Sequence, residues 1–550
     1  MVPNILFVNL PNVPVKAILN DLSFDTFLTL KKSMPLGILY LSSYIKKHNK
    51  IGRVGLIDYA ANFEQIRACR SIDEFIVRIA HREVNFVPDL ILFSLIFSVS
   101  HEFCIRAIKL LRRIWPNSTV LVGGIHATNY TEKLLEYEYI DYIARGEGEK
   151  GLSEFIEQFS NGKRINVQGI YSKEKINSER PLELCEFIYD LDEIPFPDWD
   201  LINMNMYTDV AYIAITGREK EIQNKSKSAV ILATRGCPCK CTYCSQHTVH
   251  GRQIRYRSID NVIEEIELLH KRYNVTTFVP NDDMFISQKK RDLELLHLIK
   301  ELSIPHIEFQ FPNGLHSNSM DPAIMDALIG VGTKIVNIAI ESGSDYVQKY
   351  LIKKNVNLKK ARVIVRNFRE KGVYVRCFFI LGFPGETKEQ MQETIDYAKS
   401  LEADWFDFFL AIPLLGSEMY DQFVKLGYIK KDEPIWSEVY VLGRNFDTKE
   451  ISSREIKDLA YRANLECNFI NNTNKKNKEY KKAISMFEDI INRYPFHIIA
   501  WYSMMECYRE LENREKVGEI EERIKELVLT NTLAKDMYNK YNDLMENLKI

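Results

Sequence analysis

Short apolar runs alternate with amphipathic stretches through the first 160 residues of the chain. Runs of β-branched and large apolar residues predict strands at 5–8, 54–57, 90–95, 119–122 and 142–144. Amphipathic stretches between them, such as 36–47 and 101–114, predict helices. Alternating strands and helices are typical of a parallel α/β sheet. Residues 1–160 are therefore predicted to form a doubly wound, Rossmann-like domain of the flavodoxin-like type.

The alternation of predicted strands and helices is interrupted after residue 160 and resumes at residue 229. Residues 161–228 are less periodic, contain Pro195 and Pro197 and a charged stretch at 217–228, and are predicted to be a connector. Strands are expected again at 229–233, 276–279, 307–311, 334–340, 373–381 and 405–411. Helical patterns such as 259–273 and 358–371 separate them. Residues 229–430 are therefore predicted to form a partial, TIM-like (β/α)6 barrel with its chemistry at the carboxyl ends of the strands.

The remaining residues, 431–550, carry charged amphipathic helical patterns and almost no strand signal. From about residue 470 the spacing is similar to a tetratricopeptide (TPR) pattern, carried by Ala483, Phe487, Pro495, Trp501 and Tyr508. Only about one and a half repeats are readable, so the prediction is a TPR-like helical module. Contact with a partner protein through this module is an open expectation.

The composition narrows the class of protein. Basic and acidic side chains nearly balance, 73 against 75, which argues against a protein built to hold nucleic acid or to coat an anionic membrane. The longest apolar stretch, 90–97, is far shorter than the ~20 residues that span a bilayer. The first residues lack a basic lead and a long apolar core, so no secretory signal is expected. The prediction is a cytoplasmic protein without a membrane span.

Cysteine placement gives the first indication of chemistry. The chain has 10 cysteines, and four fall in one short window: Cys237, Cys239, Cys241 and Cys244. The spacing predicts that the thiolates of Cys237, Cys241 and Cys244 meet at one metal centre, with Cys239 pointing elsewhere. A 4Fe–4S cluster with one open iron is favoured. Zinc is the alternative, with Cys239, His247 or His250 as its fourth ligand.

Small and polar residues follow the predicted strands of the first domain. They are Asn9, Ser94, Ser98, Gly123, Gly124, His126, Gly146 and Glu147. Ligands of doubly wound sheets bind beyond the carboxyl ends of the strands, so these residues are candidates for holding a large ligand. Two simpler interpretations stay open. The Gly123-Gly124 pair could only form a turn, and His126 could be a packed loop histidine.

Taken in order, the motifs resemble those of one enzyme family. The three cysteines, with Tyr243 before the last, are similar to the motif of radical S-adenosylmethionine (SAM) enzymes, and they follow the first strand of the predicted barrel. Further matches follow later strands: Asn281-Asp282-Asp283, Glu341-Ser342-Gly343-Ser344, the run from Leu381 to Thr387, and the run from Pro413 to Ser417. Pro35-Leu36-Gly37, Gly123-Gly124 and Gly146-Glu147 are similar to the cobalamin domain of the cobalamin-binding subgroup. The resemblance covers about residues 1–430.

The resemblance implies roles for individual residues. The open iron of the cluster would bind the amino and carboxylate groups of SAM. Asp282 and Asp283 would accept hydrogen bonds from the methionyl ammonium, although an ordinary acidic loop is the alternative. Glu341 and Ser342 would hold the ribose hydroxyls, or else cap a strand end. Tyr243 and the segment from Ile380 to Gly382 would border the adenine. Arg376 would offset the methionine carboxylate or form a structural ion pair.

The resemblance also implies an activity. The N-terminal sheet would hold cobalamin facing the radical site, with no cobalt ligand from residues 9–16, which lack histidine. A 5′-deoxyadenosyl radical would abstract hydrogen from the substrate, and a methyl group on cobalt would pass to an unactivated carbon or phosphorus. Alternatives are oxidative cyclisation or rearrangement, and a first domain that has lost cobalamin. A small-molecule or peptide substrate and an external flavodoxin- or ferredoxin-type electron donor would be the partners.

Overall fold

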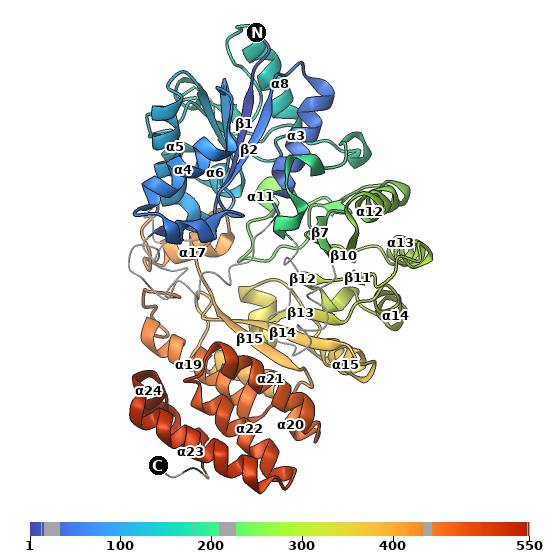
Figure 1. Ribbon diagram of the computed structural model, residues 1–550, viewed down its shortest axis with the longest axis vertical. Helices are drawn as coiled ribbons and strands as arrows, with labels where there is room; N and C mark the ends of the chain where they lie inside the picture. Colours follow the sequence, from blue (N-terminus) through green and yellow to red (C-terminus); the bar gives the residue numbers. More distant parts are fainter. Residues whose placement is uncertain are drawn as a thin grey trace.

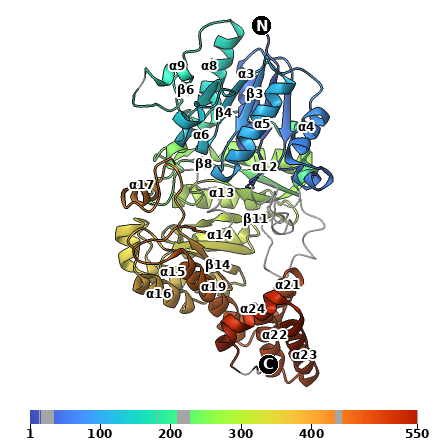
Figure 2. The same ribbon diagram turned by 90° about the vertical axis from the view of Figure 1, so that its left-hand side faces the viewer.

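The structure is a computed structural model that describes residues 1–12, 14–15, 34–178, 180–207, 227–432, 443–546 and 548. Figure 1 shows an N-terminal sheet with its helices at one end, a curved strand–helix array in the middle, and the C-terminal helices at the other end. The view turned by 90° in Figure 2 gives the same order along the long axis. The array therefore lies between the N-terminal sheet and the helical tail.

The N-terminal sheet has the strand order β2-β1-β3-β4-β5-β6. Its strands are β1 (Ile5–Asn9), β2 (Val54–Asp58), β3 (Leu90–Ser94), β4 (Thr119–Gly123), β5 (Tyr142–Ala144) and β6 (Ile170–Tyr171). Five are parallel, and β6 pairs antiparallel with β5. The order 2-1-3-4-5 is that of flavodoxin-like folds, so the predicted fold is confirmed.

Helices cover both faces of this sheet. They are α3 (Leu36–His48), α4 (Ile72–Glu83), α5 (His101–Ile114), α6 (Ile125–Asn129), α7 (Thr131–Leu134), α8 (Glu149–Ser160) and α9 (Lys173–Ile176). Alternate residues of β1 serve the two faces. Ile5 and Phe7 pack with residues of α3 and α8, whereas Leu6 and Val8 pack with residues of α4 and α5. The continuous apolar run of each strand follows from this two-sided burial.

The predicted connector is more ordered than a linker. The two-residue strand β6 extends the N-terminal sheet past residue 160. Three short 3₁₀ turns follow: η3 (Leu191–Glu193), η4 (Trp199–Leu201) and η5 (Met204–Tyr207). Leu191, Trp199 and Tyr207 are buried in the same core as the strands of the barrel. Residues 188–207 therefore belong to the packing of the barrel. Most of the charged stretch 217–228 lies outside the described residues.

The barrel consists of two sheets. One has the order β11-β10-β7 and the other β12-β13-β14-β15. The strands are β7 (Lys227–Ile231), β10 (Val275–Pro280), β11 (Glu308–Phe309), β12 (Phe311–Leu315), β13 (Ile335–Glu341), β14 (Tyr374–Leu381) and β15 (Trp405–Leu410). The helices are α11 (His247–His250), α12 (Ile259–Tyr273), α13 (Lys289–Glu301), α14 (Pro322–Gly330), α15 (Leu358–Glu370), α16 (Lys388–Lys399) and α17 (Glu418–Lys425). All strand pairs within these two sheets are parallel.

Two details differ from the predicted barrel. The single strand expected at 307–311 is split into β11 and β12. Pro312 lacks a backbone donor and Gly314 has a φ of 84°, so the register shifts between Phe311 and Leu315. A two-stranded ladder, β8 (Thr234–Arg235) with β9 (Arg255–Tyr256), is additional. It lies immediately before the cysteine loop and brings residues 234–235 next to 255–256.

The tail is helical, as predicted. Its helices are α19 (Ser453–Leu465), a π-helical turn η8 (Glu466–Ile470), α20 (Thr473–Lys476), α21 (Tyr480–Arg493), α22 (Ile498–Glu510), α23 (Arg514–Thr530), α24 (Thr532–Tyr541) and the 3₁₀ turn η9 (Asn542–Leu544). The side chain of Asn468 accepts from Phe406 N and donates to Phe406 O, both at 2.8 Å, and so occupies backbone groups of β15. TPR-like character stays a prediction.

No helix of the described ranges is long and apolar enough to cross a membrane.

Candidate active site

The cysteine loop follows β8 and is held by its neighbours. Gly236 has a φ of 92°, and a Cβ there would lie 2.2 Å from Gln253 O, so only glycine fits. Further along the loop, Thr242 donates to Leu351 O at 2.7 Å and to Ile352 O at 3.0 Å. The loop therefore cannot swing freely. It places its thiols in a hollow at the carboxyl ends of the barrel strands.

All four cysteines of the loop line this hollow, which has about 930 Å³ of empty space. Cys237, Cys241 and Cys244 therefore share one hollow, and their joint binding of one cluster stays a prediction. The prediction that Cys239 points elsewhere was wrong, because its thiol hydrogen-bonds with the thiols of Cys237 and Cys241. Alternation of side-chain direction holds for an extended strand, whereas this segment is an irregular loop.

The thiols differ in acidity. A hydrogen bond from Cys239 is the largest influence that lowers the pKa of Cys241, to about 7, and the Lys354 ammonium acts in the same direction. Thiolates are the form that binds iron or zinc. In the described part of the chain, no three His, Cys, Asp or Glu side chains are close enough to hold a single metal ion.

The acidic loop after β10 supports the cysteine loop. Asp282 Oδ1 accepts from Ala233 N at 2.9 Å and Thr234 Oγ1 at 2.8 Å, while Asp283 Oδ2 accepts from Gly236 N at 3.2 Å. Both carboxylates line the hollow. Asp282 Oδ2 is buried with no hydrogen-bond partner, and burial raises the pKa of this carboxyl to about 7. An orphaned acceptor here fits a ligand that brings a donor, as the ammonium of SAM would.

The end of β13 contributes a second polar group. Glu341 has a φ of 70°, which is unusual for a residue with a side chain. Its Oε1 accepts from Tyr243 Oη at 3.0 Å and from Lys354 Nζ at 2.8 Å, and all three side chains line the hollow. Lys354 was not predicted from the sequence. Ser342 faces away from this group, because its Oγ contacts Thr394 Oγ1 at 2.9 Å and accepts from Ser344 N.

Besides Ser342, three more residues predicted at the SAM site do not line the hollow. Arg376 pairs with Asp407 at 2.8 Å, which is the structural alternative. Ile380 packs against the core that joins the two domains. Gly382 has a φ of 87°, and a Cβ there would meet Ile456 Cδ1 at 2.1 Å, so its place is explained by packing. Contact of these residues with SAM stays a prediction.

The loop after β14 contains a buried carboxyl group. Glu386 Oε2 accepts from Gly382 N at 2.6 Å and Phe383 N at 2.9 Å, and burial raises the pKa of Glu386 to about 8. The folded protein therefore holds this proton more tightly than the unfolded chain. It follows that stability should fall as the pH rises through the interval from the ordinary carboxyl range to about 8.

Glu386→Gln is expected to remove this dependence. The free energy of unfolding of the variant should rise relative to wild type by up to about 1.4 kcal/mol per pH unit across that interval. Unfolding midpoints measured from pH 5.5 to 8.5 would test it. Glu393→Gln, at an exposed position of α16, is the control. Parallel curves for wild type and Glu386→Gln would contradict the assignment.

A second hollow lies between the N-terminal sheet and the barrel and has about 1290 Å³ of empty space. Five of the residues predicted to hold cobalamin line it: Ser94, Gly123, Gly124, Gly146 and Glu147. Residues of the barrel, Arg235 and His250 among them, form its opposite wall. Gly124 has a φ of 104°, and a Cβ there would lie 2.5 Å from Leu95 O. Wall glycines and a large volume fit a bulky ligand such as cobalamin.

Three further residues predicted for cobalamin lie outside this hollow. Asn9 donates to Asp58 at 2.9 Å. Ser98 Oγ lies 2.7 Å from His126 Nδ1, and His126 Nε2 lies 3.0 Å from His101 Nδ1. Burial first, and the neighbouring His101 second, hold the pKa of His126 well below its ordinary value. These contacts agree with the interpretation of His126 as a packed loop histidine. Contact of Asn9, Ser98 and His126 with cobalamin stays a prediction.

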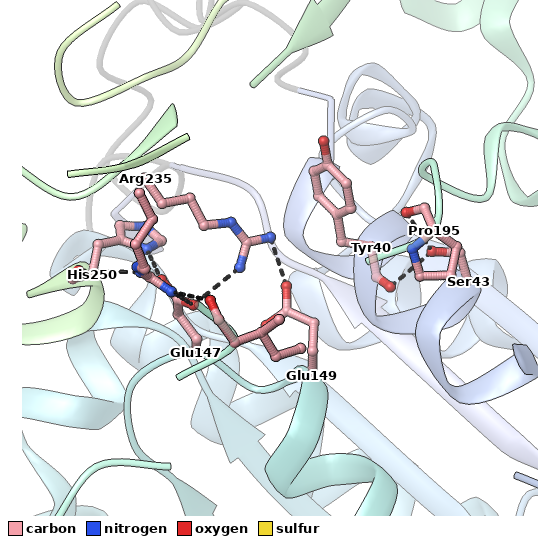
Figure 3. A network of polar contacts seen from close by, with 9 residues as sticks. Tyr40, Ser43, Glu147, Glu149, Pro195, Arg235 and His250 are labelled. Atoms are coloured by element: carbon pink, nitrogen blue, oxygen red, sulfur yellow. Dashed lines mark hydrogen bonds and ion pairs between the residues drawn. The ribbon is translucent and has the colours of Figure 1, made fainter. Parts of the chain in front are cut away.

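Buried charges join the two domains beside the cysteine loop. Figure 3 shows Arg235 and His250 of the barrel pointing toward Glu147 and Glu149 of the N-terminal domain. Glu147 accepts from His250 Nδ1 at 2.7 Å and from Arg255 Nη1 at 2.9 Å, and Arg235 lies 2.7 Å from Glu149. Burial alone would raise the pKa of Glu147, but His250, Arg235 and Arg255 outweigh it and hold that pKa well below its ordinary value.

Comparisons with known proteins divide the chain into the same two domains, the N-terminal sheet and the barrel. A model of the radical SAM superfamily matches residues 231–398, and a B12 binding domain model matches residues 31–156. The chain is 28% identical over 472 residues to cytidylyl-2-hydroxyethylphosphonate methyltransferase of Streptomyces wedmorensis, covering 79% of this chain and 86% of that protein. It is 28% identical over 391 residues to an uncharacterized methyltransferase of Pyrococcus horikoshii, covering 70% and 78%.

Solved structures share the fold. The cobalamin-dependent SAM radical enzyme OxsB, with aqua-cobalamin and SAM bound, has a TM-score of 0.59 at 17% identity, covering 100% of this chain and 85% of that chain. The methyltransferase TsrM of Kitasatospora setae has a TM-score of 0.57 at 18% identity, covering 77% and 76%. Sequence models, fold and cysteine loop agree with the predicted cofactors, a 4Fe–4S cluster, SAM and cobalamin. The chain belongs to the radical SAM superfamily, among the enzymes that carry a B12 binding domain.

Proposed function

We propose that the enzyme is a cobalamin-dependent radical SAM methyltransferase acting on an unactivated carbon or phosphorus. The observation that carries this proposal is the junction of the two hollows. Asp283 lines both the cysteine hollow and the interdomain hollow. Next to it, Asn313 of the first hollow donates to Asn281 of the second at 3.0 Å. A substrate at this junction would reach both cofactors.

Different residues of the chain would bind the cluster and the different groups of SAM. Bound cluster and SAM supply a carbon-centred radical, and bound cobalamin supplies a methyl group. Cys237, Cys241 and Cys244 would hold the cluster by three thiolates. The orphaned Asp282 Oδ2 would accept from the ammonium of SAM. Glu341 Oε1 is taken by Tyr243 and Lys354, so its Oε2 would serve a ribose hydroxyl.

The junction is also suited to a radical reaction. The residues around it come from the end of β10 and the loop after it, from β12, and from the cysteine loop, which is held by hydrogen bonds to its neighbours. Cobalamin would close the interdomain side of the hollow and exclude water there. An external one-electron donor of the flavodoxin or ferredoxin type belongs to this proposal, as does a small-molecule or peptide substrate. Cytoplasmic location and a partner for the helical tail stay predictions.

The experiment uses the anaerobically reconstituted protein with cobalamin, a chemical reductant and SAM carrying a deuterated methyl group. A small-molecule extract of the source cells supplies the substrate. We expect S-adenosylhomocysteine and 5′-deoxyadenosine together, with a new compound that carries the labelled methyl group. Relatives named as anaerobic magnesium-protoporphyrin IX monomethyl ester cyclases, about 25% identical, make cyclisation the competing outcome. Consumption of an extract compound with 5′-deoxyadenosine alone would overturn methyl transfer.

A further inference from the structure

The outer side of the cysteine loop lies at the protein surface. Pro238 and Lys240, which alternate with the cysteines, are exposed to solvent. The thiols of the same loop line the hollow on its inner side. A cluster bound by this loop would therefore lie only one layer of backbone beneath the solvent. SAM would occupy the hollow and cobalamin the interdomain hollow, so the outer side of the loop is the side left for the delivery of electrons.

Positive charge gathers on this side of the loop. Residues 236–258 contain four Lys or Arg side chains and no Asp or Glu. Two of the four, Lys240 and Arg252, are exposed. Neither forms an ion pair within the described part of the chain, and Arg252 donates to Cys239 O at 2.5 Å. The chain as a whole has a net charge of −2, so this positive charge is a local feature.

An exposed aromatic pair lies beside the same loop. Thr242 Oγ1 donates to Leu351 O at 2.7 Å, which packs the segment before Leu351 against the loop. In that segment, Tyr346 and Tyr350 are 53% and 55% exposed, and their ring centroids are 5.0 Å apart. Lys349 Nζ lies 5.1 Å from the ring centroid of Tyr350. Tyrosine is enriched at protein interfaces because it combines an apolar ring with a polar hydroxyl, so this pair indicates a contact surface.

These exposed residues together form what we call the loop face. Its members are Pro238, Lys240, Arg252, Tyr346, Lys349, Tyr350 and Lys353. Two exposed acidic residues lie beside it, Asp345 and Glu418, and Glu418 pairs with Lys353 at 2.5 Å. Four basic side chains against two acidic ones leave the loop face positive. A partner with negative charge around its own contact site would be steered toward this face and oriented on it.

We infer that the loop face docks a small acidic one-electron carrier protein that reduces the cluster. The inference rests on the proposed function only in taking the cluster as the electron acceptor. The carrier loses one electron and the oxidised cluster gains it, so the step is balanced without another reactant. Lys240, Arg252 and Lys349 would orient the carrier by charge. Tyr346 and Tyr350 would supply the apolar contact that keeps it in place.

The test compares two reductants on anaerobically reconstituted protein with SAM and without substrate. Reduced flavodoxin, an acidic carrier protein, must dock, whereas dithionite at saturating concentration reaches the cluster by diffusion alone. The double variant Lys240→Glu/Lys349→Glu should lower the second-order rate of 5′-deoxyadenosine formation with flavodoxin by about 10-fold or more at low salt. The rate with dithionite should not change. The difference between the proteins should shrink at about 1 M salt, where the Debye length is about 3 Å.

A second variant leaves the cysteine loop untouched. Lys349→Glu/Tyr350→Ser should show the same selective loss with flavodoxin and should also weaken the binding of oxidised flavodoxin, measured by titration of its flavin fluorescence. Lys481→Glu/Lys535→Glu reverses two exposed charges of the helical tail and is the matched control, expected to behave like wild type.

Two results would overturn the inference. One is an equal rate with flavodoxin for wild type and Lys349→Glu/Tyr350→Ser. The other is an equal loss of rate with flavodoxin and dithionite in that variant, which would mean that the substitutions damage the cluster site. Both measurements precede methyl transfer. A protein that cleaves SAM with flavodoxin but methylates nothing would therefore contradict the proposed function and leave the docking result unchanged.

Discussion

Replacing Cys241 with alanine is expected to abolish the iron–sulfur cluster and, with it, all cleavage of SAM. The thiol of Cys241 lies in the hollow, and its lowered pKa favours the thiolate that an iron atom requires. Two of the three predicted ligands would remain, which is too few to bind the cluster stably. Iron and sulfide analysis of anaerobically reconstituted protein should fall from about four iron atoms per chain to below one. Formation of 5′-deoxyadenosine should fall to background.

Cys239 provides the matched control. It lies in the same loop, lines the same hollow and is similarly half-buried, so Cys239→Ala tests the loop without removing a predicted ligand. We expect this variant to keep its iron and its SAM cleavage. A Cys239→Ala variant that loses iron as completely as Cys241→Ala would contradict the assignment of Cys237, Cys241 and Cys244 as the three ligands.

The fold was predictable where the chain has long apolar runs. β3 and β13 are buried on both faces, and such strands stand out in the sequence as runs of mostly apolar residues. Periodicity failed for elements of two residues, such as β8 and β9, which hold no repeat to detect. The break between β11 and β12 depends on the backbone conformation at Gly314, which the residue type permits but does not require.

The site was predictable as far as motif spacing reached. The cysteine loop, Asp283 and Glu341 lie at strand ends, and parallel strands bring their carboxyl ends to one edge. Lys354 was missed because the sequence does not distinguish it from Lys353. Only the folded turn distinguishes the two adjacent lysines: Lys353 pairs with Glu418 at the surface, and Lys354 lies in the hollow beside Glu341. For His126 the sequence left two interpretations open, a cobalamin contact and a packed loop histidine, because its contact with His101 joins residues that are distant in the sequence.

The charged contacts between the two domains could not be predicted from the sequence either. Glu147 stands in a motif of the first domain, yet only the fold shows that it pairs with Arg235, His250 and Arg255 of the barrel. Figure 3 shows Arg235 and His250 in this arrangement. The carboxylate of Glu147 is therefore taken up by ion pairs, although its residue lines the cobalamin hollow. The Gly146-Glu147 motif, which was predicted to bind cobalamin, therefore also joins the B12 binding domain to the barrel beside the cysteine loop.

Glu147→Gln is accordingly expected to lower the free energy of unfolding by about 3–5 kcal/mol at neutral pH. The side chains of Glu147 and Arg255 are 4% and 3% exposed, so the variant would leave the buried guanidinium of Arg255 without its carboxylate partner, whereas Arg235 keeps Glu149. Urea unfolding of the protein prepared without cofactors would measure the change. Glu157→Gln, on the exposed face of α8, removes a charge outside the network and is the control.

The pH dependence of this difference identifies its cause. A carboxyl group whose pKa is lowered on folding contributes stability above its unfolded pKa and loses it as the pH falls toward the folded value. The gap between wild type and Glu147→Gln should therefore be widest at neutral pH and narrow below about pH 4. A gap that stays constant from pH 7 to pH 3 would mean that the substitution acts through packing. In that case the buried charges would not be what joins the B12 binding domain to the barrel.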